Sequence, residues 1–198
     1  KNYKNLNNNL IAGFNLSCVG DKGPFTLISS KEGNTYADKI AKRILSKTKN
    51  FKVEAFLKRG SNERQFGCQN LNLPFVTICR TRFGDYKEYH TSHDNLKIIS
   101  EKNLKLTLKK ISLIVKEIQN NKIFIKNLNC EPFFSKYDLV RSTRKKANNL
   151  ERNLFSIAAY VDRNYDEVEL AKLLKISKNN LLKNLKILSD KKIIKTLI

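Results

Sequence analysis

The two histidines of the chain lie three residues apart in one short segment, EYHTSHD, which spans residues 88–94. An imidazole that binds a metal ion is usually held through its second ring nitrogen by a hydrogen-bond acceptor. Asp94 follows His90 by four residues and, after a turn, is placed to be that acceptor. We therefore predict that His90 is a metal ligand oriented by Asp94, against the alternative of an ordinary surface or core histidine. We expect His93 to be exposed and to take no part in a site.

Asp21 is the second residue whose position favours chemistry. It ends the apolar stretch LIAGFNLSCVG (10–20), which predicts a buried strand that runs into a turn. One interpretation is a turn aspartate that binds its own backbone. The other is an oxygen ligand for a metal, since open α/β sheets place their sites at the carboxyl ends of strands.

The segments around these residues predict an α/β layered domain. Residues 34–47 read as an amphipathic helix with a polar cap at Asn34 or Thr35, and residues 100–120 as a long helix capped by Ser100. Short strands are expected at 51–57 and 75–80, separated by a polar loop. The apolar face that we expect to cover the sheet from the long helix comprises Leu104, Leu108, Ile111, Ile114 or Val115, and Ile118.

The last fifty residues follow a different plan. Three short helices and a trailing apolar stretch predict a winged helix-turn-helix, with Ser177 capping the third helix. We predict domains at 1–126 and 150–198, joined by a connector at 127–149 that ends in a basic polar run. The third helix and its start carry Lys178, Lys183 and Lys186, which are candidate phosphate contacts.

Two observations oppose nucleic-acid binding by this segment. The chain stops after one strand, so a complete two-stranded wing is not expected, and the third helix offers no arginine to read guanine. The competing interpretation is a small module that packs on the α/β domain or on a second subunit, as in a homo-oligomer.

Composition narrows the classes of protein that fit. The 198 residues carry a formal charge of +21, but lysine is spread along the chain, so a compositional bias competes with a nucleic-acid surface as the cause. Four widely spaced cysteines and the lack of an apolar run long enough for a membrane span favour a cytoplasmic protein. The chain contains no methionine, so we expect it to be part of something longer or a processed product.

Three stretches of the chain resemble a known family: AGFNLSCVGDKGPFTLISSKEGNTYADKIAKRIL, KRGSNERQFGCQNLNLPFVTICRTRFGDYKEYHTSHDNL and NCEP. They are similar to the carboxyl-terminal half of the aminopeptidase-like domain proteins. That family belongs to the clan of co-catalytic zinc aminopeptidases and carries an added winged-helix domain. The resemblance implies an α/β fold with a zinc-peptidase (phosphorylase/hydrolase-like) layered sheet, of which this chain holds a part.

The resemblance also implies roles for particular residues. Asp21 would bind one zinc ion and His90 the other, in a site that holds two ions when complete. Asn62 stands where the family has an aspartate, which puts any charge-dependent role of that position in doubt. The loop that lines the site would contribute Arg59, Gly60, Ser61, Glu63, Arg64 and Gln65.

The remaining family ligands and the general-base glutamate would lie upstream of this chain. A catalytic zinc ordinarily has three protein ligands and an open position for water, so we expect the chain alone to be inactive. Two accounts follow. In the first, a longer metallopeptidase hydrolyses the amino-terminal amide of a small peptide or amino-acyl conjugate. In the second, the chain is a non-catalytic remnant whose exposed sheet edge needs a partner.

Overall fold

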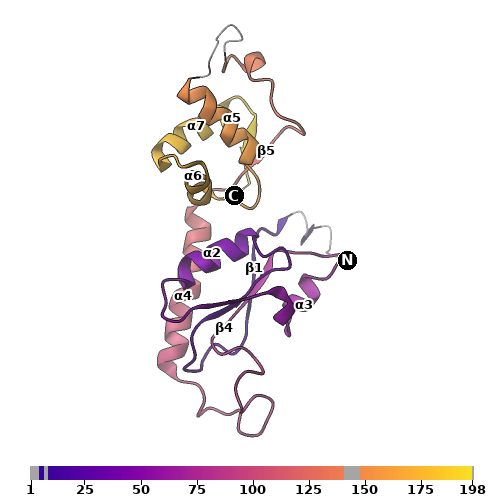
Figure 1. Cartoon of the computed structure of the whole chain (residues 1–198), viewed down its shortest axis with the longest axis vertical. Coiled ribbons are helices and arrows are strands. Elements are labelled where there is room, and N and C mark those ends of the chain that lie inside the picture. Colours follow the sequence, from indigo (N-terminus) through magenta and orange to yellow (C-terminus); the bar gives the residue numbers. More distant parts are fainter. Residues whose placement is uncertain (1–4, 7–8, 141–147, 198) are drawn as a thin grey trace. The chain divides into compact units, whose positions relative to one another are not determined.

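The computed structural model describes residues 5–6, 9–140 and 148–197, and it divides the chain into two compact units, 1–118 and 119–198 (Figure 1). The basic run that ends the predicted connector falls on residues 141–147 and lies outside the described residues. The unit boundary precedes the predicted domain boundary at residue 126, because the strand at 124–126 pairs within the second unit.

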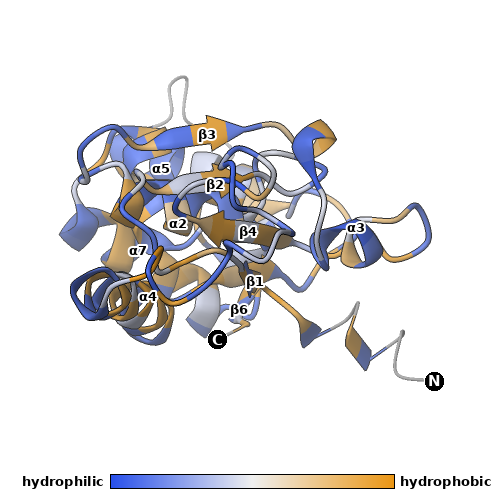
Figure 2. Cartoon of the chain, turned by 90° about the horizontal axis from the view of Figure 1, so that it is seen from below, coloured by the Kyte–Doolittle hydropathy of each residue, from blue (hydrophilic) through white to orange (hydrophobic). Residues whose placement is uncertain are grey.

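Unit 1 is built on a four-stranded mixed sheet with the order β1-β4-β2-β3 (Figure 2). β1 runs parallel to β4, β4 runs antiparallel to β2, and β2 runs parallel to β3. Sequence reasoning did not find β2, because three fully buried residues show no alternation of polar and apolar side chains. The strands are β1 (Gly13–Leu16), β2 (Thr26–Ile28), β3 (Lys52–Glu54) and β4 (Phe75–Cys79).

Helix α2 (Tyr36–Leu45) contributes a large part of the core of unit 1. Its first turn is closed by a capping box between Thr35 and Asp38. The Asp38 carboxylate is fully buried and also accepts hydrogen bonds from the backbone N–H and the hydroxyl of Ser30, at 3.0 and 2.5 Å. This network fixes the start of α2 to the end of β2. The helix buries Ala37, Ile40, Ala41, Ile44 and Leu45.

Helix α4 (Glu101–Asn120) forms where the sequence predicts it, and part of the predicted apolar face is buried. Thr107 is buried, and its hydroxyl donates a hydrogen bond to the Val19 carbonyl at 2.9 Å. Leu104 and Leu108, which were expected to cover the sheet, are 40% and 67% exposed. Ile114 of the predicted face is 1% exposed, and Ile111 and Ile118 are half-buried. The buried face therefore overlaps the predicted one but is turned toward Thr107.

Two short helical segments lie between the strands of unit 1. The single 3-10 turn η1 (Phe56–Lys58) follows β3, and α3 (Glu63–Phe66) lies within the stretch that the sequence predicts as a polar loop. The Phe66 ring stacks on Phe75 of β4, with ring centroids 4.0 Å apart. This aromatic contact ties the loop to the sheet.

The described residues of unit 2 form three α-helices, a 3-10 turn and a two-stranded antiparallel sheet. Asn148 and Asp166 cap the first two helices, and Ser177 caps the third, as predicted, by accepting a hydrogen bond from Asn180 N–H. The strand that follows the third helix pairs with a strand that precedes all three helices. The elements are β5 (Phe124–Lys126), η2 (Phe134–Tyr137), α5 (Asn149–Tyr160), α6 (Glu167–Leu174), α7 (Lys178–Asp190) and β6 (Ile194–Thr196).

The core of unit 2 is separate from that of unit 1. It is formed by the inward faces of the three helices together with the strands and η2. Phe134, in the predicted connector, is buried there and meets the Phe155 ring edge-on at 4.6 Å. The first part of that connector is thus a component of unit 2.

Candidate active site

The candidate site lies at one edge of the sheet in unit 1. β1 and β4 are parallel and both end at this edge, while β2 and β3 begin there. Asp21 follows β1, and Thr81 follows β4. A polar side chain that follows each of two adjacent parallel strands is brought to the same edge, as expected for open α/β sheets.

Asp21 is 8% exposed, and donors from two segments hold its carboxylate. Oδ1 accepts hydrogen bonds from Gly23 N–H at 2.5 Å and from the Thr81 hydroxyl at 2.7 Å. The Thr81 N–H lies 3.1 Å from Oδ2 and 3.3 Å from Oδ1. Asp21 is therefore a turn aspartate that also joins two strand ends, and Oδ2 keeps most of its capacity to accept.

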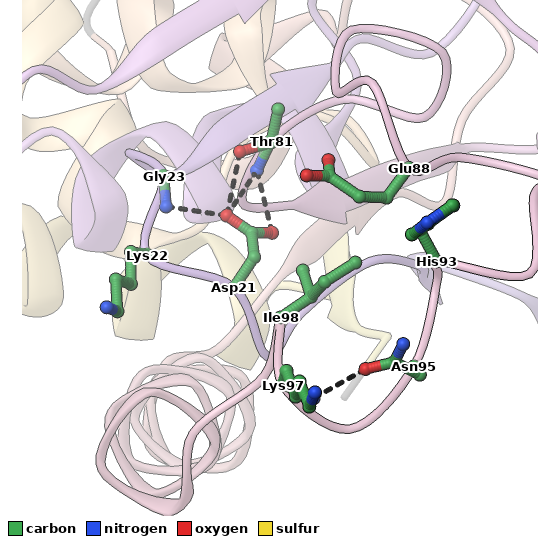
Figure 3. Close-up of a pocket in the computed structure, with 9 residues that line it drawn as sticks. All are labelled: Asp21, Lys22, Gly23, Thr81, Glu88, His93, Asn95, Lys97 and Ile98. Carbon is green, nitrogen blue, oxygen red and sulfur yellow. Dashed lines mark hydrogen bonds between the residues drawn. The ribbon is translucent and has the colours of Figure 1, made fainter.

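A cavity of about 520 Å³ opens beside Asp21 (Figure 3). In Figure 3 the Glu88 carboxylate and the His93 ring project from the loop after β4 toward the same cavity as Asp21. Two carboxylates, an imidazole and the Lys97 side chain therefore line one space, whereas the Lys22 side chain extends away from Glu88 and His93 in Figure 3. The cavity is lined by Asp21, Lys22, Gly23, Thr81, Glu88, His93, Asn95, Lys97 and Ile98.

The other two predicted site residues of this loop lie differently. His90 is exposed, stacks on the Tyr89 ring with centroids 4.0 Å apart, and does not line the Asp21 cavity. Asp94 accepts a hydrogen bond from the Tyr86 hydroxyl at 3.2 Å. In the described part of the chain, no hydrogen bond connects Asp94 to His90. The structure thus brings His93 rather than His90 to the cavity, and the metal role of His90 stays a prediction.

Tyr86 links this loop to the segment that follows β1. Its hydroxyl lies 3.6 Å from the Cys18 thiol and also reaches Asp94. Burial and the contact with Cys18 raise the pKa of Tyr86 above its ordinary value, with a smaller contribution from Asp94. Burial likewise raises the pKa of the Cys79 thiol to about 12, so this thiol stays protonated at neutral pH.

Glu63, which the family resemblance places at the site, lies buried beside β4 instead of lining the cavity. Its Oε1 accepts from Gly60 N–H at 2.7 Å and Ser61 N–H at 3.0 Å, and its Oε2 accepts from the Thr77 hydroxyl at 2.7 Å. Burial opposes ionisation, but the hydrogen bonds from Ser61, Thr77 and Gly60 outweigh it, so the pKa of Glu63 is lowered. Glu63 holds the loop to the sheet.

The remaining residues of that loop are more exposed. Arg59 lies over the Phe56 ring, with its guanidinium carbon 4.9 Å from the ring centroid. Arg64 and Gln65 are exposed, and Ser61 is half-buried. None of them lines the Asp21 cavity.

The candidate nucleic-acid contacts in unit 2 also differ from one another. Lys178 forms an ion pair with Glu167 at 2.7 Å, and Glu167 is buried. Lys183 and Lys186 are exposed on α7.

The described residues do not by themselves fit a zinc ion. No group of three His, Cys, Asp or Glu side chains among them converges on a point that could hold a metal. Asp21 has a suitable oxygen, but zinc sites in enzymes use at least three protein ligands. In the part of the chain that the structure describes, no helix is long and apolar enough to cross a membrane.

Comparison with known proteins gives the family. Residues 1–121, which include the whole sheet and the Asp21 cavity, match the family described as "Domain of unknown function (DUF4910)". The chain belongs to this family. The match ends at α4, so it does not include the three helices of unit 2.

Two longer relatives of this DUF4910 chain come from Clostridium acetobutylicum. One is a "Putative polysaccharide biosynthesis protein with aminopeptidase-like domain", 34% identical over 141 residues, which are 70% of this chain and 31% of the relative. The other is the crystal structure of a "putative peptidase", with 25% identity and a TM-score of 0.60 over 98% of this chain and 43% of that chain. The chain thus spans less than half the length of either. Both support an aminopeptidase-like domain with a mixed α/β fold.

Several cavity residues of this DUF4910 chain were missed by sequence reasoning. Thr81 follows the buried strand β4, as Asp21 follows the half-buried strand β1, and this shared position at a strand end was the available signal. His93 and Glu88 lie in the segment 88–94, in which His90 and Asp94 were predicted as site residues. The conformation of this loop decides which of its side chains faces Asp21. No periodicity in the sequence reports that choice.

Proposed function

We propose that this chain is part of an aminopeptidase-like hydrolase and that the Asp21 cavity is its contribution to the active site. The observation that carries the proposal is the buried Asp21 carboxylate at the end of β1, which faces a cavity shared with Glu88 and His93. The names of the two relatives support the same class of reaction.

The charges around the cavity fit the amino end of a small peptide or amino-acyl conjugate. A substrate ammonium group would find acceptors in Asp21 and Glu88, and the ammonium group of Lys97 would attract a carbonyl or carboxylate oxygen. His93, when neutral, has a ring nitrogen that accepts a proton. These residues therefore bind and orient a substrate and offer a place for a proton.

Zinc dependence is part of the proposal. Asp21 and His90 would each supply one ligand to a pair of ions, Asp94 would orient His90, and residues outside this chain would complete the set. The relatives are more than twice as long as the matched part, which leaves room for such residues. In the isolated chain we expect no turnover, because the described residues lack a third ligand.

The test compares the isolated chain with the product of the complete reading frame that encodes it. We expect the complete protein to contain zinc and to hydrolyse an amino-acyl p-nitroanilide, and the isolated chain to do neither. Asp21→Asn should abolish turnover, and His90→Ala should remove zinc more completely than His93→Ala. A complete protein that binds no zinc and cleaves none of a panel of amino-acyl amides would refute the proposal.

We also propose that unit 2 is a winged helix. Three capped helices and the antiparallel β5–β6 pair support it. Lys183 and Lys186 are exposed, whereas Lys178 is paired with Glu167, so α7 offers few free cations to a phosphate backbone. We therefore favour a role in packing or self-association, which sedimentation of the complete protein would test against salt-sensitive DNA binding.

A further inference from the structure

A second cavity, of about 320 Å³, lies at the same edge of the unit 1 sheet and is lined by Arg80. We name it the Arg80 pocket. Arg80 directly follows β4, and its backbone N–H donates to the Cys18 carbonyl at 3.0 Å, which fixes where its side chain starts. The side chain emerges between the start of β2 and the segment that joins α2 to β3. The polar and charged residues that line the pocket are Lys22, Thr48, Lys49, Asn50 and Arg80.

The Arg80 guanidinium is buried without its full set of hydrogen bonds. The residue is 7% exposed, and both Nε and Nη1 are buried and lack a hydrogen-bond partner among the described residues. Arg80 also takes part in no ion pair in that part of the chain. A guanidinium stays charged in proteins, so the charge itself remains in the pocket.

One contact of Arg80 offsets part of that cost. Its guanidinium carbon lies 4.8 Å from the centroid of the Phe25 ring, within the range of a cation–π interaction. A ring face attracts the charge, but it leaves the N–H groups in the guanidinium plane free to donate. Buried donors without partners are rare in native proteins and call for a ligand or ordered water.

The surroundings favour an anion over water alone. Lys22 and Lys49 bring two further cations to the pocket, and no acidic residue is among the described residues that line it. Asn50 adds a neutral donor, while Phe25 and Leu106 form an apolar wall. The Thr48 hydroxyl donates to the Leu45 carbonyl at 2.6 Å, so it offers a ligand only its lone pairs. Phosphate and carboxylate oxygens are the groups that such a set of donors and charges binds best.

We propose that the Arg80 pocket is a binding site for the phosphate or carboxylate group of a small molecule. Arg80 would donate from Nε and Nη1, and Lys49 and Lys22 would neutralise the remaining charge. The volume is at the lower end of the range for small-molecule sites, so the ligand is larger than a bare ion but smaller than a dinucleotide. This inference does not depend on hydrolase activity at the Asp21 cavity.

The experiment titrates the 198-residue chain with inorganic phosphate and, separately, with acetate, each against sodium chloride at equal ionic strength. Calorimetry or chemical-shift changes should show saturable binding of one or both anions, which identifies the preferred group. Arg80→Gln should weaken binding by about tenfold or more, as the loss of a charge-assisted contact implies. Lys49→Gln should weaken it by a smaller factor.

Lys58→Gln is the matched control. It removes the same charge from an exposed lysine in η1, after β3, that does not line the pocket. We expect it to leave binding unchanged. If Arg80→Gln fails to fold by circular dichroism, Lys49→Gln carries the test, since Lys49 is exposed. Absence of saturable binding, or equal affinity in the Lys49 and Lys58 variants, would overturn the proposal.

Discussion

Unit 1 holds its acidic side chains in two different ways. Asp38 and Glu63 are fully buried, and several backbone and hydroxyl donors saturate each of them. Glu88 and Asp94 lie in the loop after β4 with little or no such support. The first pair stabilises the fold, and the second is free to meet a ligand. A carboxylate in a family motif can therefore belong to either group. The two groups differ in how many hydrogen bonds the carboxylate accepts from the protein.

Removing the Asp38 carboxylate is the strongest test of the first group. Asp38→Ala leaves the buried donors of Ser30 and Thr35 without an acceptor. We expect the free energy of unfolding of unit 1 to fall by about 3 kcal/mol, because each buried donor loses a charged partner. Urea unfolding followed by circular dichroism measures this, and amide hydrogen exchange in β2 and α2 locates it.

Asp94→Ala is the control for that experiment. It makes the same chemical change at an exposed position with a single hydrogen bond. We expect a cost below about 1 kcal/mol. Equal costs for the two substitutions would remove the distinction between the buried and exposed groups.

Glu63→Gln sharpens the comparison through pH. The pKa of Glu63 is lowered in the folded state, so its charge adds stability above the ordinary value of 4.5, and that stability is lost as pH falls through the folded value. We expect the variant to be less stable by about 2 kcal/mol at neutral pH. The difference from the parent chain should shrink below pH 4.5, and a constant difference down to about pH 3 would contradict the lowered pKa.

Much of the fold follows from the sequence, and the reasons are local. The capped helices α2 and α7 and the strand β4 are set by caps and by apolar spacing that a reader can see. β2 has only three buried residues, and the face that α4 presents depends on the Thr107 contact with Val19, which is remote in sequence. Long-range contacts of this kind leave no periodic signal.

The site was less predictable than the fold for a related reason. Asp21 could be placed at a strand end from local sequence, and its burial agrees with that placement. The choice between His90 and His93 depends on the path of a loop. Arg80 carries no sequence signal, because one arginine among many cations has no distinguishing spacing. Burial without a partner is visible only in three dimensions.

Tyr86→Phe tests how firmly the exposed loop is attached to the sheet. The substitution removes the hydroxyl that reaches both Cys18 and Asp94 but keeps the ring. We expect a loss of about 1 kcal/mol, typical of one hydrogen bond. Because the pKa of Tyr86 is raised, mainly by burial, the variant should lose a tyrosine that ionises above the ordinary tyrosine pKa in an absorbance titration. Loss of an early-titrating tyrosine instead would contradict this placement.

The smallest effect is expected at His90. Its ring is exposed and stacks on the neighbouring Tyr89 ring, so His90→Ala should change the free energy of unfolding by less than about 0.5 kcal/mol. Its backbone has a φ of 58°, in the left-handed region, so His90→Gly should be at least as stable as His90→Ala. Thermal unfolding of both variants measures the difference. If His90→Ala instead lowers the free energy of unfolding by more than about 2 kcal/mol, the imidazole stabilises the fold, as Asp38 and Glu63 do. An unchanged free energy of unfolding would show that the imidazole has no structural role, and it would then be available to bind a ligand.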